Sequence, residues 1–145
     1  MDDAQVDLRL FRTWLNASKS LFENVKKDIA SHELTLENFM VMEMIYSKGP
    51  QYIQTLSEKL SIPSGSITYV VNKLEKLGVV VRELDEDNKR YCKVVLTEQG
   101  EALFNEVFPK HVAVIRENFE VLTESEKLQL TNLLKKMGLN AKAKQ

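Results

Sequence analysis

The segment IPSGSITYVVNKLEKLG, residues 62–78, combines an apolar stripe with an unusual polar face. Its apolar residues recur at helical spacing, and the opposite face carries small hydroxyls, an amide, a phenol and lysines. Hydroxyl and amide groups can hydrogen-bond to base edges in a DNA groove, and lysines can neutralise phosphates, whereas a glutamate-rich face would repel them. The side chains predicted to contact bases and phosphates are Ser64, Ser66, Thr68, Tyr69, Asn72 and Lys73.

Two of these side chains receive distinct roles from their places on the helical wheel. Asn72 lies near the centre of the polar face, and an asparagine can pair with adenine through two hydrogen bonds. Lys73 lies nearer the rim of the face, where phosphates would run. The pattern therefore predicts base reading by Asn72 and backbone contact by Lys73.

Catalytic chemistry is not indicated. The two histidines, His32 and His111, lie far apart in the sequence and show neither triad nor metal-ligand spacing. Five scattered glycines form no phosphate-binding loop. The sequence predicts a protein that is not an enzyme and that uses no cofactor and no metal.

Composition is that of one globular domain in a reducing compartment. The 145 residues are 43% hydrophobic and 28% charged, with a net charge of −1. No apolar run approaches the roughly 18 residues of a membrane span, and the acidic start MDDAQVD lacks the features of a secretory signal. One cysteine fits a reducing environment. A cytoplasmic protein with no membrane partner is expected.

The elements that must position the polar helix are predicted in a definite order. A polar stretch, DEDNK, joins two β-branched runs and indicates a hairpin. Helix, turn, helix and hairpin in succession are typical of a winged helix-turn-helix, whose second helix enters the major groove. Lys89 and Arg90 at the hairpin tip are then predicted DNA contacts. The predicted helices cover residues 5–30, 35–49, 54–60, 62–78, 97–122 and 123–139, and the hairpin strands cover 79–84 and 91–96.

Three stretches resemble the MarR (multiple antibiotic resistance regulator) family over nearly the whole chain. They are LTLENFMVMEMIYSKGP, TLSEKLSIPSGSITYVVNKLEKLGVVVR and DEDNKRYCKVVLTEQG. Two positions depart from the family pattern. Asn88 stands where the wing usually has an aspartate two residues before Arg90, and Ser61 stands in the turn where glycine is common.

The resemblance implies a mainly α (α+β) fold of one domain, residues 1–145. Residues 1–34 and 100–145 would be dimerisation helices, and residues 35–99 the winged helix-turn-helix. The implied function is that of a homodimeric repressor on a pseudo-palindromic operator in double-stranded DNA.

A small aromatic or phenolic ligand would release such a repressor, as the resemblance implies. The stretch RLFRTWLNASKSLFENVKKDI resembles the subgroup that answers to quinones and hydroquinones. The side chains expected to line a ligand cleft are Phe11, Trp14, Leu15, Phe39 and Met42.

Two alternatives remain open from the residues. A thiol- or metal-switched repressor would use a reactive Cys92 or bind a metal ion, and a winged-helix protein-interaction module would bind no DNA. Cys92 alternates with Val94 and Leu96, so the pattern predicts an inward-facing and unreactive thiol.

Overall fold

The computed structural model describes residues 2–88 and 91–145, which form a mainly helical chain with a small antiparallel sheet. This confirms the predicted mainly α class and the order of helix, turn, helix and hairpin. The elements are α1 (Asp3–Ser31), α2 (Leu36–Lys48), β1 (Gln51–Tyr52), α3 (Ile53–Leu60), α4 (Ser64–Lys76), β2 (Val80–Leu84), β3 (Cys92–Leu96), α5 (Glu98–Phe119) and α6 (Glu124–Ala143).

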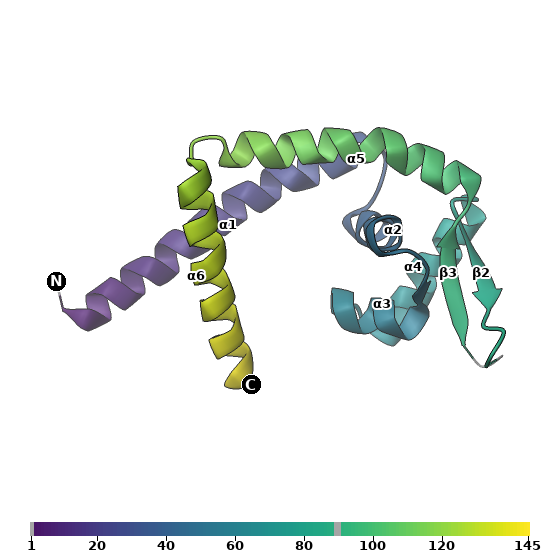
Figure 1. Cartoon of the computed structure of the whole chain (residues 1–145), viewed down its shortest axis with the longest axis horizontal. Coiled ribbons are helices and arrows are strands. Elements are labelled where there is room, and N and C mark those ends of the chain that lie inside the picture. Colours follow the sequence, from purple (N-terminus) through teal and green to yellow (C-terminus); the bar gives the residue numbers. More distant parts are fainter. Residues whose placement is uncertain (1, 89–90) are drawn as a thin grey trace.

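Helix α5 connects two unequal parts of the molecule (Figure 1). Its first half covers the winged helix-turn-helix formed by α2, α3, α4 and the sheet, and its second half runs beside the C-terminal part of α1. The N-terminal half of α1 and the whole of α6 extend away from the winged part (Figure 1). The chain thus has one compact end and one end of long, uncovered helices.

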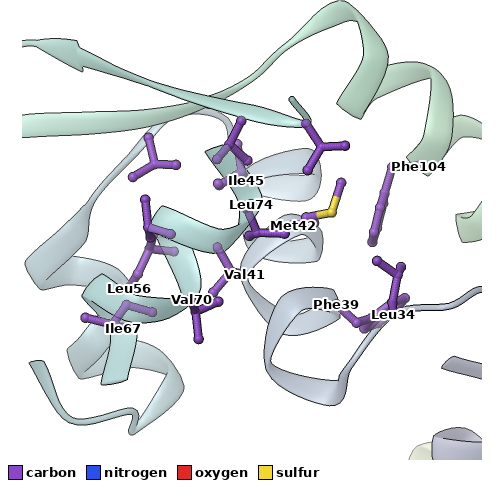
Figure 2. Packing of buried hydrophobic residues seen from close by; sticks show 14 of the residues in the cluster. Leu34, Phe39, Val41, Met42, Ile45, Leu56, Ile67, Val70, Leu74 and Phe104 are labelled. Carbon is purple, nitrogen blue, oxygen red and sulfur yellow. The ribbon is translucent and has the colours of Figure 1, made fainter. Parts of the chain in front are cut away.

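The hydrophobic core lies in the winged part and centres on α2 (Figure 2). Val41 and Met42 of α2 are fully buried, as are Leu56 of α3 and Leu74 of α4. Phe104 of α5 closes the core on the side of the long helices. Each such side chain removed from water stabilises the fold by about 1.5–3 kcal/mol, so this core fixes how α4 is oriented.

The turn between α3 and α4 requires one residue in a left-handed backbone conformation. Ser61 adopts a left-handed conformation with φ 54° and ψ 39°, which costs a residue with a Cβ more than it costs glycine. Ser57 stabilises the turn because its hydroxyl donates a hydrogen bond to the carbonyl of Ile62 at 2.5 Å. The buried Ile62 side chain holds the turn against the core.

The sheet has the strand order β1-β3-β2, with every pair antiparallel. Gly100, in the first turn of α5, packs against the backbone of Val79, the residue before β2. A Cβ at this position would lie 2.0 Å from the carbonyl oxygen of Val79, so only glycine lets α5 approach the backbone so closely.

The structure adds one strand to the predicted elements and moves several of their ends, such as that of α5, which ends at Phe119 instead of near residue 122. The two-residue strand β1 was not predicted, because so short a strand carries no alternating pattern. Helix α6 was expected to end near Leu139, and that was wrong, since it continues to Ala143. None of the helices in the described ranges, 2–88 and 91–145, is long and apolar enough to cross a bilayer.

Candidate nucleic-acid interface

Helix α4 turns its polar face fully outward. Four apolar side chains, Ile67, Val70, Val71 and Leu74, are buried and hold the other face against the core. Tyr69 lies on the opposite face and is 68% exposed. The structure brings together on one exposed face all six side chains predicted on this helix, Ser64, Ser66, Thr68, Tyr69, Asn72 and Lys73.

The N-termini of α3 and α4 differ from those of the other helices. Side chains cap α1, α2, α5 and α6, the cap residues being Asp2, Thr35, Thr97 and Thr123. Neither α3 nor α4 has a side-chain cap, so the first backbone N–H groups of both helices are left for other acceptors. Free N–H groups at the positive end of a helix suit phosphate oxygens.

Two side chains on the polar face are already partly engaged. Thr68 donates its hydroxyl hydrogen to the carbonyl of Ser64 at 3.0 Å, which leaves its lone pairs and its methyl group for a ligand. The Oδ1 atom of Asn72 accepts a hydrogen bond from Nη2 of Arg82 in β2 at 2.7 Å. The same guanidinium binds the carboxylate of Glu75. The predicted two-point pairing of Asn72 with adenine therefore has to compete with Arg82.

Arg82 was not among the predicted site residues. It lies in the apolar run VVVREL, where an arginine looks like an ordinary outward-facing strand residue. Its role depends on the packing of β2 against α4, ten residues away from Asn72 along the chain. The only available signal was that Arg82 and Glu83 follow a run of three valines.

A tyrosine and an aspartate fasten the turn end of the hairpin to the strand that precedes α3. The hydroxyl of Tyr52 in β1 donates to Oδ2 of Asp85, at the end of β2, at 2.5 Å. Oδ1 of Asp85 accepts from the backbone N–H of Asp87 at 3.1 Å, which shapes the start of the hairpin turn. The Tyr91 ring packs edge-on against Tyr52, with 6.0 Å between centroids. The hairpin is thus held where its strands meet the turn.

These contacts shift the pKa values of Asp85 and Tyr52 in opposite directions. The hydrogen bond from Tyr52, followed by that from the Asp87 N–H, holds the pKa of Asp85 below its usual value. The same hydrogen bond to Asp85 raises the pKa of Tyr52. Because the folded-state pKa of Asp85 is lowered, its stabilising contribution is present above the ordinary aspartate pKa and is lost as pH falls through the lowered value.

An open cleft of about 910 Å³ separates the start of α4 from the wing. Polar and apolar side chains from α3, α4 and the wing line it, among them the acids Glu58 and Asp85. The cleft lies beside the uncapped N-termini of α3 and α4. Its lining includes Tyr52, Gln54, Thr55, Ser64, Thr68, Tyr91 and Cys92.

Of the wing residues weighed in the sequence analysis, the structure describes Cys92 but not Lys89 and Arg90. Lys89 and Arg90 lie outside the described residues. Cys92 is half-buried rather than fully buried, and it borders the cleft beside α4. Val94, two residues further on, is the strand residue that fills the core.

The five predicted ligand residues are not gathered in one cleft of this chain. Phe11, Trp14 and Leu15 lie on the N-terminal half of α1 and are exposed. Phe39 and Met42 are buried in α2.

A polar cluster occupies the joint between α1, α2 and α5. The Asp28 carboxylate, whose side chain is 9% exposed, lies 3.2 Å from Nε2 of His32 and 3.6 Å from Nδ1 of His111. The His111 ring packs on Phe39 with 4.6 Å between centroids. Among the described residues, Oδ2 of Asp28 and Nδ1 of His111 have no hydrogen-bond partner, although both are buried. This joint connects the long helices to the helix-turn-helix.

An exposed recognition helix, a hairpin wing and a polar cleft between them define a winged helix-turn-helix DNA-binding module. The MarR family model matches residues 34–91. The HTH-type transcriptional regulator MhqR of Bacillus subtilis (strain 168) is 40% identical over 135 residues, which cover 93% of each chain. On this evidence the chain belongs to the MarR family and is a transcriptional regulator rather than an enzyme.

Solved structures support the same fold over almost the entire chain. AbsC, a MarR family regulator from Streptomyces coelicolor, matches with a TM-score of 0.85 at 22% identity, covering 99% of this chain and 97% of AbsC. Sco3205, a MarR family regulator from the same organism, has been solved in complex with DNA. It matches with a TM-score of 0.80 at 20% identity, covering 95% of this chain and 88% of Sco3205.

The fastening of the wing gives a pH-dependent prediction. Replacing Tyr52→Phe removes the hydroxyl that donates to Asp85, so the pKa of Asp85 should rise toward the ordinary aspartate value of about 3.9. A titration followed by carboxyl carbon NMR measures this value directly. Tyr91→Phe is the matched control and should leave it unchanged; an unchanged Asp85 pKa in Tyr52→Phe would show that the hydroxyl does not hold the carboxylate.

Proposed function

We propose that the chain is a homodimeric repressor that binds a pseudo-palindromic operator and is released by a small aromatic or phenolic ligand. Helix α4 of each copy would enter the major groove, and the wing would follow the neighbouring backbone, with Lys89 and Arg90 as its phosphate contacts. The residues of each half-site contact are Ser64, Ser66, Thr68, Tyr69, Asn72 and Lys73.

The observation that carries this proposal is the contrast between the two faces of α4. One face is fully committed to the core, while the other presents hydroxyl, phenol, amide and ammonium groups to solvent. The uncapped helix ends of α3 and α4 and the cleft beside them add places for phosphate oxygens. The polar face of α4, the N-termini of α3 and α4 and the cleft would then all contact the same DNA strand.

Dimerisation is supported by apolar surface that one chain leaves uncovered. All of residues 2–17 are exposed, and they include Leu8, Phe11 and Leu15 at helical spacing. No residue of α6, Glu124–Ala143, is buried within the described chain, although Leu130, Leu134 and Met137 form an apolar row on that helix. Exposed apolar helices of this length need a partner, and a second copy supplies one. Residues 1–34 and 100–145 are accordingly proposed as the dimerisation region, which includes Phe11, Trp14 and Leu15.

The ligand is proposed to act at the joint beside Phe39. A phenolic ring could pack on Phe39, and its hydroxyl group could satisfy both the Asp28 oxygen and the His111 nitrogen that lack partners. Because Asp28 belongs to α1 and His111 to α5, an inserted ligand would shift the long helices against the winged part. Two recognition helices must stay about 34–36 Å apart to fit successive grooves, so a small shift weakens both half-sites.

The rival function is a winged-helix module that binds proteins instead of DNA. It predicts no salt-dependent DNA binding, whereas phosphate contacts make the logarithm of affinity fall linearly with the logarithm of salt concentration. Selection of sites from random DNA followed by a salt titration separates the two functions.

The recognition face gives a paired prediction. Tyr69→Ala should lower affinity for the selected operator about ten-fold and leave random DNA unaffected, because a base contact discriminates by about 1–3 kcal/mol. Lys73→Ala should weaken both DNAs and reduce the salt slope by about one unit. Lys110→Ala on α5 is the matched control, since this lysine pairs with Glu106 away from α4. Normal DNA binding by both Tyr69→Ala and Lys73→Ala would show that α4 does not enter the major groove.

The uncovered face of α6 gives a prediction about assembly. Leu134→Glu places a charge in the proposed dimer interface, so sedimentation equilibrium should show the 16.7 kDa monomer. Leu84→Glu makes the same replacement at an exposed leucine of the wing and should leave the dimer intact. A dimer that tolerates Leu134→Glu would place the interface elsewhere.

The ligand proposal is tested by release of bound DNA. Hydroquinone should displace the protein from its operator, while toluene, which has a ring but no hydroxyl group, should not. His111→Phe keeps a ring against Phe39 but removes the unpartnered nitrogen, so DNA binding should persist and release should require about ten-fold more hydroquinone, equivalent to a loss of about 1.4 kcal/mol. Equal release of the wild type and His111→Phe would exclude this joint as the ligand site.

A further inference from the structure

Arg82 connects the wing to the middle of the recognition helix. Its Nη2 atom lies 2.7 Å from Oδ1 of Asn72, and its Nη1 atom binds the carboxylate of Glu75. The side chains of Arg82 and Glu75 are 25% and 32% exposed, so the ion pair lies partly out of solvent. Both α4 partners face the same guanidinium, which fixes their side chains relative to β2.

This contact determines which end of the Asn72 amide is available. A guanidinium can only donate hydrogen bonds, so the amide oxygen must face Arg82 and the amide nitrogen must point away from it. An unrestrained asparagine can rotate to offer either its donor or its acceptor. Asn72 is held with its amide nitrogen directed away from Arg82 and with one of the two lone pairs of its oxygen occupied.

The bases differ in what they offer to such a side chain. Guanine presents two adjacent acceptors, N7 and O6, in the major groove, whereas adenine presents one acceptor and the N6 amino donor. Two-point pairing of asparagine with adenine needs the amide oxygen to accept from N6. Beside Asn72 that oxygen is shared with Arg82, whose N–H groups would also face the amino group of adenine, donor against donor.

We propose that Arg82 is a specificity-determining positioning residue, which orients the Asn72 amide so that its nitrogen is offered to DNA as a hydrogen-bond donor and thereby selects guanine over adenine at one position of each half-site. The inference rests on the proposed entry of α4 into the major groove. Glu75 contributes by anchoring the guanidinium and by offsetting its charge, so that the pair discriminates by hydrogen bonding rather than by general attraction to DNA.

The test measures the binding of duplexes that carry each base pair in turn at every position of a selected half-site. The wild type should prefer guanine over adenine by about ten-fold at one position, as expected of a good base contact. Asn72→Asp removes the donor but can still accept from Arg82, so the guanine preference at that position should disappear. This exposed substitution should leave the fold intact.

The role of Arg82 is tested by the ratio of the affinities for guanine and adenine at each position of the half-site. If Arg82 only stabilised the fold, replacing it would not change this ratio at a single position. Arg82→Met frees the amide, and the guanine-to-adenine ratio should fall about ten-fold at the position that depends on Asn72. Arg82→Lys keeps a donor and should retain part of the preference. Glu75→Gln keeps an acceptor for the guanidinium and should retain the preference in full. If Arg82→Met does not fold, Arg82→Lys and Asn72→Asp decide the question.

The outcomes separate this inference from the function on which it rests. A wild type that binds specifically but prefers adenine at the Asn72 position would overturn the inference and leave the function standing. An Asn72→Asp profile identical to the wild type would do the same, as would a folded Arg82→Met protein with an unchanged ratio. A wild type with no preference for any site over random DNA would overturn both.

Discussion

The burial of one face of α4 is the constraint on which the rest of the structure depends. Val71 and Leu74 are fully inaccessible, and Ile67 is nearly so. Rotating the helix about its axis would expose these side chains, at a cost of about 1.5–3 kcal/mol each. The packing of the core therefore determines which side chains of α4 can contact a ligand, and it does so already in the free protein. A recognition surface built in this way is rigid in the free protein.

The wing depends on that rigid helix through two polar contacts. Arg82 ties β2 to the outer side of α4, while Tyr52 and Asp85 tie the turn end of the hairpin to β1. Each contact joins two different elements, and the one between Tyr52 and Asp85 lines the cleft between helix and wing. The same contacts that place the wing also restrict the chemistry of the helix, since Arg82 orients the amide of Asn72. Architecture and recognition are thus coupled in one cluster of side chains.

Sequence reasoning reached most of the fold, because local signals specify most of it. The apolar spacing within α4 identified its exposed face correctly, and Thr123 marked the start of α6. The two-residue strand β1 and the contact between Arg82 and Asn72 were missed, because both depend on pairing between separate elements. The predicted ligand set shows the same limit, since helical spacing reveals an apolar face but not what covers it.

The central claim is that a dimer presents two copies of α4 to successive major grooves on one face of DNA. A hydroxyl-radical footprint on a selected operator tests this claim most directly. Two protected regions are expected on the same face, centred about 10–10.5 base pairs apart, which is one helical turn. A single protected region, or two regions on opposite faces of the duplex, would contradict it.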